Sequence, residues 1–516
     1  MSYFHICLYK RNIFLNIAFY DIDMNQERDE VYSHVLKYTG VFGGVQGLNV
    51  LIGLVRNKFV AMLLGPGGMG LVSLFTTTVQ LLSQATNLGV SFSAVRHISE
   101  CYDAGDTERA AHFVRVVRGW CLLTALLGML LCIVVGPFLS NTTFAWGDHT
   151  LHFILLSPAI GMLAITGGET AILKGQRRLG ALALVQICSA LASLVISIPI
   201  YYFFWQAGIV PVIVLMAFVT MCATLRFSLR LYPLQLRGMC GILGEGMEMV
   251  RLGVAFTLAG IVGSAAEMVI RSYLNVVGDL DMLGFYNAGY MLTITYAGLV
   301  FSAMDTDYYP RLSGVNQDVE ATNFTVNRQM EVSLLIVAPM LTALIALLPV
   351  FIPQLFTSEF LPVVPMAQVA ALAMFFKVLT LPVAYITLAR GYSLSYLAFE
   401  SAYYVALVLL IVIGYEQWGL WGTGLAIALA HAFEFMMIHV YAYKKYGYRM
   451  TVTVSQYAFV LFTLGGLAYA CTILLTGIVY WVVELLVVLA SGLYSLQILR
   501  QKTHLWQALT RRFRKS

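Results

Sequence analysis

Four basic side chains lie inside stretches of sequence apolar enough to span a lipid bilayer: Arg56, Lys58, Arg271 and Lys377. A cation in the hydrocarbon core costs at least about 2.5 kcal/mol, so such a residue usually faces an internal cavity and marks a functional site. Arg binds phosphate and carboxylate groups with two parallel hydrogen bonds, and Lys acts as a point charge. With no haem or metal motif beside them, the four cations predict a cavity that receives an anion.

The two cations of the first apolar stretch are not equivalent. Arg56 shares one helical face with Asn49 and Gly53, and it lies about 12 Å from the end of the span near Leu64 at the rise of an α-helix. Lys58 points to roughly the opposite side of the same helix and lies nearer its end. It either lines the cavity or extends its ammonium group to the interface.

The other two cations have candidate partners. Arg271 follows Glu267 by four residues, which is the spacing of an ion pair within a helix. Lys377 lies near the middle of its span with no acid within one helical turn. It is predicted to hold an anionic substrate at the membrane midplane, the depth of many transporter sites. The alternative is an ion pair with an acid of another helix, such as Glu434.

Three acids in or beside the spans are candidates for ion coupling: Glu267, Glu400 and Glu434. A membrane carboxylate can carry a proton or help to bind Na⁺, and His431 lies three residues before Glu434. The alternative for each acid is a hydrogen bond between helices with no role in coupling. Coupling to H⁺ and coupling to Na⁺ both remain open.

The composition is that of a membrane protein. Of 516 residues, 59% are hydrophobic and only 11% are charged, against about 25% charged in soluble domains. We predict an all-α polytopic fold with about fourteen transmembrane helices, each of about 20 residues. The predicted spans are 38–64, 70–96, 112–136, 151–174, 180–204, 208–228, 252–277, 284–304, 330–353, 363–388, 394–415, 419–443, 455–475 and 477–498.

The basic residues predict the orientation. Of the 31 Lys and Arg residues, all except the four intramembrane cations fall in the termini or in loops on one side of the predicted membrane. By the positive-inside rule that side is cytoplasmic. We therefore predict a multi-pass membrane protein with both termini in the cytoplasm. The net charge of +5 follows from this asymmetry and does not indicate a nucleic-acid partner.

The chain contains an internal repeat. Gly65 and Met69 recur as Gly278 and Met282, and three further landmarks recur at nearly the same offset. These are Pro137 with Pro353, Phe144 with Phe360, and Lys174-Gly175 with Arg390-Gly391. Two parallel six-helix lobes are the expected result. The predicted divisions are a cytoplasmic extension (1–35), an N-lobe with helices 1–6 (36–235), a C-lobe with helices 7–12 (236–450), helices 13 and 14 (451–498) and a basic cytoplasmic tail (499–516).

Three segments carry a resemblance to a known family. They are Arg56-Asn-Lys-Phe-Val-Ala-Met-Leu-Leu-Gly-Pro-Gly-Gly-Met-Gly-Leu, Phe356-Thr-Ser-Glu-Phe-Leu-Pro and Gly419-Leu-Trp-Gly. The chain resembles the polysaccharide-transport (O-antigen-unit) flippases of the multidrug/oligosaccharidyl-lipid/polysaccharide exporter superfamily. The resemblance implies a protein of the bacterial inner membrane that has two lobes around a central cavity and works by alternating access. It also implies a cationic lumen for an undecaprenyl-diphosphate-linked oligosaccharide, such as an O-antigen or related repeat unit.

Three other functions remain open at this point. A lipid-linked peptidoglycan-precursor flippase would share the fold and the anionic substrate. A cation-coupled multidrug antiporter would favour acids in its cavity, which the four cations argue against. A membrane polymerase or glycosyltransferase would need a large outer loop or an acidic metal site, and neither is found. We therefore expect a transporter rather than an enzyme, with no cofactor, no metal and no catalytic residue. A polysaccharide polymerase and a chain-length regulator are expected partners.

Overall fold

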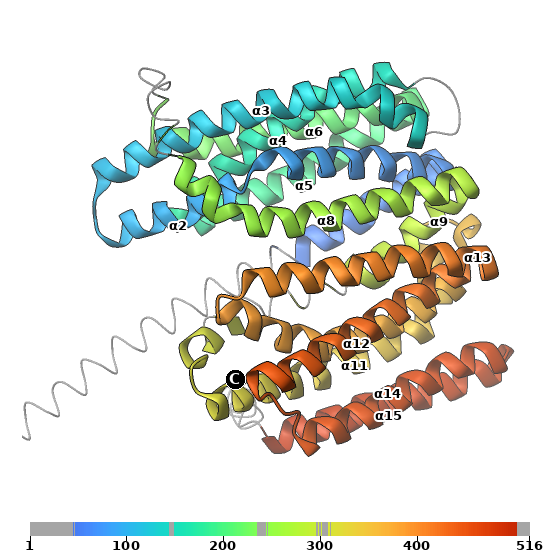
Figure 1. Cartoon of the computed structure of the whole chain (residues 1–516). Helices are drawn as coiled ribbons and strands as arrows, with labels where there is room; N and C mark the ends of the chain where they lie inside the picture. Colours follow the sequence, from blue (N-terminus) through green and yellow to red (C-terminus); the bar gives the residue numbers. More distant parts are fainter. Residues whose placement is uncertain are drawn as a thin grey trace, which may run out of the picture.

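The structure is a computed structural model, and it describes residues 47–143, 149–234, 246–295 and 311–502, together with residues 45, 244, 298, 301, 308 and 309. These residues form a bundle of long helices (Figure 1). The predicted extension 1–35, most of the segment that joins the predicted lobes and the last residues of the basic tail lie outside the described residues.

Within the described residues, nine helices are long and apolar enough to cross a membrane. Three of them are long enough for two passes: Gly47–Asn87, Gly180–Leu231 and Ser393–Tyr446. Each is broken near its middle, at Gly65, Trp205 and Gly419, where φ is +66°, +51° and +58°. Left-handed backbone of this kind interrupts a right-handed helix. Divided at the breaks, the nine helices supply twelve apolar segments.

The remaining two predicted spans are occupied by α8 (Met247–Val277) and by the segment that begins at α9 (Leu280–Tyr290) and continues as a π-helix over Met291–Thr295. The all-α polytopic fold is therefore confirmed. Several boundaries differ from the prediction: α11 (Val319–Leu355), for example, begins at Val319 and not near residue 330. The second span was expected to reach residue 96, but its helix ends at Asn87, because Leu88 and Gly89 have positive φ, and α2 (Val90–Asp103) starts a new direction.

Figure 1 shows the helices in two groups, one of earlier elements (blue to green) and one of later elements (yellow to red). The earlier group is α3 (Thr107–Thr143), α4 (Thr150–Gly175), α5 (Leu179–Phe204) and α6 (Ile209–Leu231). The later group is α11 (Val319–Leu355), α12 (Val363–Ala389), α13 (Ser393–Tyr446), α14 (Val452–Leu474) and α15 (Gly477–Lys502). In the first group α4 packs on α3 and α6, and in the second α12 packs on α11 and α13. Helix α8 lies between the groups and packs mainly on α13.

Side-chain caps fix where several helices start. The Asp279 carboxylate accepts the N–H of Met282 at 2.7 Å and begins α9. Asp318 accepts the N–H of Glu320 at 2.8 Å and begins α11. Thr451 accepts the N–H of Val454 at 3.3 Å and begins α14. These caps satisfy backbone donors that have no partner inside the helix. At the other end of α13, Gly447 has φ +68°, the left-handed C-terminal residue that glycine tolerates best.

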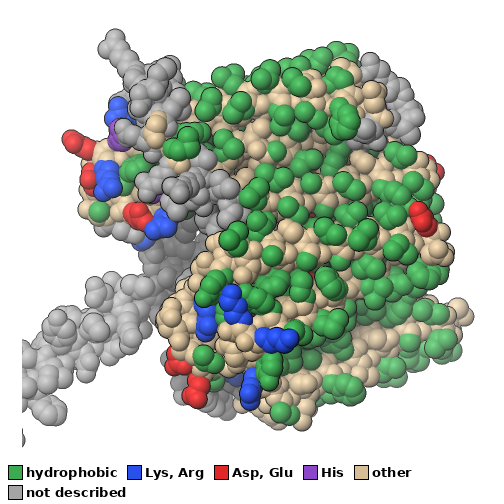
Figure 2. Space-filling model, viewed as in Figure 1, with side chains coloured by type: hydrophobic (Ala, Val, Ile, Leu, Met, Phe, Trp, Pro, Cys, Tyr) green, Lys and Arg blue, Asp and Glu red, His purple; other side chains and the backbone are tan. Residues whose placement is uncertain are grey.

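The surface has the polarity that a bilayer requires. Large apolar side chains are exposed on the outermost helices, among them Leu126, Val195 and Phe459. Figure 2 shows hydrophobic side chains over most of one face and the Lys and Arg side chains gathered toward one end of it. That distribution separates a broad apolar band from a basic end, as expected for a protein that is surrounded by lipid.

Two glycine-rich turns of the internal repeat touch each other. A Cβ atom at Gly284 would overlap the carbonyl oxygen of Pro66, and one at Gly70 would overlap the carbonyl oxygen of Leu280. A Cβ at Gly67 would lie 2.8 Å from the Asp281 carboxylate. The backbones of the two turns therefore pass at a separation that only glycine allows. We call this contact, formed by Pro66–Gly70 and Leu280–Gly284, the glycine crossing.

The glycine crossing predicts that the effect of a Gly→Ala change on stability depends strongly on its position. Gly284→Ala should force the two backbones apart and cost about 1–3 kcal/mol, the usual penalty of overpacking. The measurement is thermal unfolding of the purified protein in detergent. Gly466→Ala is the matched control, since nothing lies within 4 Å of a Cβ there. Equal melting temperatures for the two variants would contradict the close approach.

Candidate functional site

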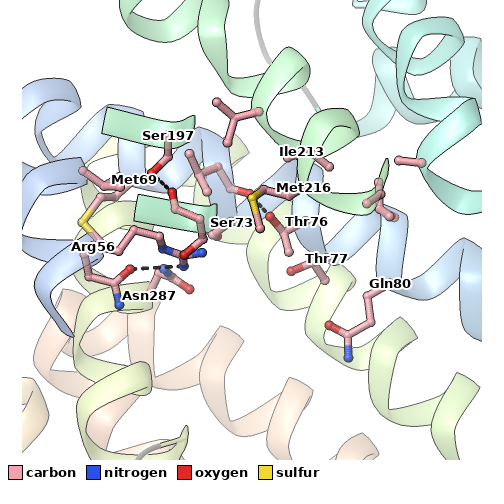
Figure 3. Close-up of a pocket in the computed structure, with 18 of the residues that line it drawn as sticks. Arg56, Met69, Ser73, Thr76, Thr77, Gln80, Ser197, Ile213, Met216 and Asn287 are labelled. Atoms are coloured by element: carbon pink, nitrogen blue, oxygen red, sulfur yellow. Dashed lines mark hydrogen bonds between the residues drawn. The ribbon is translucent and has the colours of Figure 1, made fainter. Parts of the chain in front are cut away.

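A cavity of about 520 Å³ lies among the Gly47–Asn87 helix and α4, α5, α6, α8 and α9. Its volume falls within the range of small-molecule sites, about 300–1,000 Å³. Figure 3 shows that polar side chains of the Gly47–Asn87 helix point into it from one side. Arg56, Glu267 and Arg271 are its charged lining residues, so two cations face one anion. The lining carries excess positive charge.

Arg271 is held by its own helix. Its Nη1 donates to the Glu267 carboxylate at 2.8 Å, which confirms the ion pair predicted from their spacing. The guanidinium carbon also lies 5.8 Å from the centre of the Tyr290 ring. Arg271 is only 7% exposed, whereas the Glu267 side chain is 27% exposed. The pair lowers the cost of keeping the arginine charged at this depth.

Arg56 approaches the cavity from the facing helix. Its Nη2 donates to Asn57 Oδ1 at 3.3 Å, and the Asn57 amide in turn lies 3.1 Å from the Met291 sulfur. Within the part of the chain that the structure describes, the Nε atoms of both Arg56 and Arg271 are buried and make no hydrogen bond. Buried donors in a native protein are normally satisfied by protein, water or a bound ion. Two such donors beside one cavity fit an anion ligand.

Neutral polar groups make up most of the remaining polar lining. They are hydroxyls and amides rather than charges: Ser73, Thr76, Thr77, Gln80, Ser193, Ser197, Thr220 and Asn287. Some are already bonded within their own helices, as Thr76 is to the Val72 carbonyl at 2.7 Å and Ser193 is to the Ala190 carbonyl at 2.6 Å. The cavity is therefore cationic at the arginines and neutral but polar along its length.

Lys58 does not line this cavity. Its Nζ donates to the carbonyl of Pro353 at 3.0 Å and also to that of Phe356, at the end of α11. Carbonyls in the last turn of a helix have no partner inside the helix, and a cation there is favoured by the helix dipole. Lys58 is therefore bound to the C-terminus of α11 and does not reach the cavity.

Lys377 lies in a second polar cluster, apart from the cavity. Its Nζ is 3.2 Å from one oxygen of Glu434, which is the pairing considered as the alternative from the sequence. His431 Nδ1 lies 2.9 Å from the other carboxylate oxygen, and its Nε2 lies 3.2 Å from the Tyr403 hydroxyl. Glu434 is only 4% exposed. We call Lys377, Tyr403, His431 and Glu434 the lysine cluster.

The predicted acid Glu400 borders the lysine cluster. It lies three residues before Tyr403 on α13, close enough to Lys377 for the two charges to interact. It is half-buried. The structure thus gathers Glu400, Glu434 and Lys377 in one region of α12 and α13, and it brings Glu267, Arg56 and Arg271 together at the cavity.

One buried pair was missed by the sequence reasoning. Arg118 binds Glu169 with two contacts, Nε to Oε1 at 2.8 Å and Nη2 to Oε2 at 3.1 Å. The residues are 7% and 3% exposed, and Arg118 also donates to the Tyr232 carbonyl at 2.9 Å. Arg118 is one of the basic residues that the sequence assigns to the predicted cytoplasmic side of the membrane. The signal that could have found the pair is an acid inside span four with no basic residue three or four positions away on its own helix.

The fold and the cavity define a polytopic helical membrane protein with a polar internal cavity. Residues 35–315 match the family model described as polysaccharide biosynthesis protein. Since this is more than half of the chain, the protein belongs to that family. No curated protein sequence matches the chain.

Three solved structures show the same fold. A multidrug resistance MATE family transporter of the MOP superfamily, in an inward-facing conformation, is 14% identical with a TM-score of 0.65, over 79% of this chain and 98% of its own. The lipid II flippase MurJ in an inward closed conformation is 14% identical with a TM-score of 0.61, over 89% and 98%. A MOP superfamily transporter from Pyrococcus furiosus, described by the reverse polarity of its binding pocket, is 15% identical with a TM-score of 0.57, over 80% and 96%.

The Glu267–Arg271 pair predicts a rescue pattern. Glu267→Gln should lower the amount of folded protein in the membrane, because it leaves a buried arginine with one fewer partner, a loss of about 3–5 kcal/mol for a fully buried pair. The double variant Glu267→Gln, Arg271→Gln should restore that amount. Quantified membrane protein in the three strains is the measurement. A double variant that loses the sum of both single effects would rule out the pairing.

The lysine cluster predicts a similar coupling. Lys377→Met should lower the melting temperature, since the Glu434 carboxylate then keeps only His431 as an ionisable partner within 4 Å in the described structure. Adding Glu434→Gln should recover most of the loss, because no unpaired charge remains. Lys444→Met, at an exposed position near the end of α13, is the control and should have little effect. A Lys377→Met variant as stable as Lys444→Met would refute the coupling.

Proposed function

We propose that this protein is a flippase that moves an undecaprenyl-diphosphate-linked oligosaccharide, an O-antigen or related repeat unit, across the inner membrane by alternating access. The observation that carries the proposal is the pair Arg56 and Arg271, whose side chains meet at one polar cavity and retain unsatisfied donors. A diphosphate offers the acceptor oxygens that these donors require. Membership of the polysaccharide biosynthesis family supports a saccharide substrate.

The energetic task explains the design. An unaided diphosphate and its sugar hydroxyls would lose their water in the hydrocarbon core, at a cost of several kcal/mol for each unpaired polar group. A polar cavity between the helices replaces that water, while the lipid chain stays in the bilayer. The proposed two lobes, residues 36–235 and 236–450, would rock about this site, with 451–498 as an added helix pair.

The charge of the cavity favours this function over cation export. A cationic drug would meet two arginines and one glutamate there. Two of the solved structures that share the fold agree with this proposal. One is a lipid II flippase, and the other is a transporter described by the reverse polarity of its binding pocket. A lipid-linked peptidoglycan precursor has the same diphosphate chemistry and remains the second candidate.

Coupling to an ion gradient is assigned to the acids. Glu434 and Glu400 in the later helices and Glu267 beside Arg271 are the proposed carriers of H⁺ or Na⁺. The lysine cluster supports a proton, because Lys377 and His431 already satisfy the Glu434 oxygens and leave no oxygen-rich cage for a metal ion. No group of three or more metal-ligating side chains occurs in the described residues.

Arg56→Gln should reduce transport about ten- to hundredfold, the value of one or two charged hydrogen bonds. The measurement is surface-polysaccharide production in a flippase-deficient strain, normalised to protein in the membrane. Arg96→Gln is the control, since Arg96 is exposed and pairs with Glu100 far from the cavity. Wild-type surface-polysaccharide production by a well-expressed Arg56→Gln variant would refute the anion-binding role of Arg56.

The proposed orientation, with both termini in the cytoplasm, has its own test. Reporter fusions at Glu359 and Glu416 should be active only outside, because the order of the predicted spans puts both acids on the side opposite the basic loops. Fusions after Arg178 and Lys445 should be active only inside. A cytoplasmic signal at Glu359 would break the topology from its middle onward.

A further inference from the structure

We infer that the sugar rings of the substrate bind along one polar face of the Gly47–Asn87 helix, formed by Ser73, Thr77 and Gln80. These three residues are the sugar face. The inference rests on the proposed function and deepens it, since it assigns the carbohydrate part of the substrate to named residues. The arginines account only for the diphosphate.

The spacing of the sugar face makes it continuous. Positions i, i+4 and i+7 lie on one side of an α-helix, and Ser73 to Gln80 spans about 10 Å along the axis. All three side chains line the cavity. Figure 3 shows Ser73 near Arg56, with Thr77 and Gln80 following along the helix away from the arginine. A substrate anchored by its diphosphate at Arg56 would therefore lay its sugars along this face.

The Ser73 hydroxyl is unusual for its position. Neighbouring hydroxyls of the same helix bond to their own backbone, Thr76 to the Val72 carbonyl at 2.7 Å and Thr78 to the Leu74 carbonyl at 2.9 Å. Ser73 is only 6% exposed, and its hydroxyl makes no hydrogen bond within the described part of the chain. A buried hydroxyl without a partner loses about 1–3 kcal/mol. A sugar hydroxyl or a water molecule would supply the missing bond.

The chemistry of the sugar face suits hydroxyls better than charges. Serine and threonine hydroxyls and the glutamine amide can each donate and accept, as sugar hydroxyls do. An additional phosphate would instead require cationic donors, and the charged lining is confined to Arg56, Glu267 and Arg271. Thr220 on α6 and Asn287 on α9 add hydroxyl and amide groups from other walls. The cavity thus has a charged end for the diphosphate and a neutral length for sugars.

The test compares two probes: undecaprenyl diphosphate without sugar, and the same lipid carrying an N-acetylhexosamine disaccharide. Binding to the full-length protein in nanodiscs is measured for each. The wild type should bind the sugar-bearing probe more tightly. Gln80→Leu should weaken that probe about fivefold, the value of about one neutral hydrogen bond. The triple variant Ser73→Ala, Thr77→Val, Gln80→Leu should weaken it by about fiftyfold or more and leave the bare lipid within about twofold.

Matched variants separate the outcomes. Arg56→Gln should weaken both probes, because both carry the diphosphate. Thr463→Val makes the same hydroxyl-to-methyl change on exposed α14, where the hydroxyl bonds to the Phe459 carbonyl, and should change neither. If the triple variant binds both probes as the wild type does, the face holds only water and the inference fails. If it loses both equally, the face serves the diphosphate or the fold, and the inference also fails. If the wild type binds neither probe, the proposed function itself fails.

Discussion

The constraint on which this molecule depends is that a charge inside a bilayer must have a partner. Arg118 meets that demand with Glu169, Lys377 with Glu434, and Lys58 with the carbonyls at the end of α11. Each pairing joins two different helices, so the charges act as cross-links as well as costs. The cavity arginines differ from these three, because each has a buried Nε that makes no hydrogen bond within the described residues. Arg115 and Arg390 share that property, so the position of Arg56 and Arg271 at a cavity is what makes them candidates for binding.

Much of the fold could be predicted from the sequence, because lipid imposes simple rules on length and polarity. Apolar runs of the right length predicted the spans, and the predicted boundaries near residues 64 and 419 coincide with left-handed backbone at Gly65 and Gly419. The direction change at Leu88 and Gly89 was not predicted, since it requires positive φ at a leucine, a residue that rarely adopts it. Helix type is a local property, whereas the angle at which a chain turns depends on what it packs against.

The sequence predicted one ion pair of the candidate site but not how its helices come together. Arg271 and Glu267 share one helix, so their spacing predicted their contact. Arg56 and Arg271 stand on different helices, and their meeting at one cavity required the tertiary packing. Lys58 and Lys377 carry the same charge in equally apolar sequence, yet the structure directs them to a helix end and to a carboxylate. The sequence identified which basic residues lie in the membrane, but only the packing of the helices shows which partner each of them has.

The glycine crossing carries a consequence for how such a protein can diversify. Its contact is made by backbone atoms of Pro66 and Leu280 against Gly284 and Gly70, so its fit does not depend on the chemistry of side chains in the cavity. Residues that line the cavity are free to change size, charge or hydrogen-bonding capacity while this backbone contact stays the same. A lineage built on this arrangement could exchange one cargo for another by a few substitutions at the lining. The glycine crossing itself would be inherited unchanged.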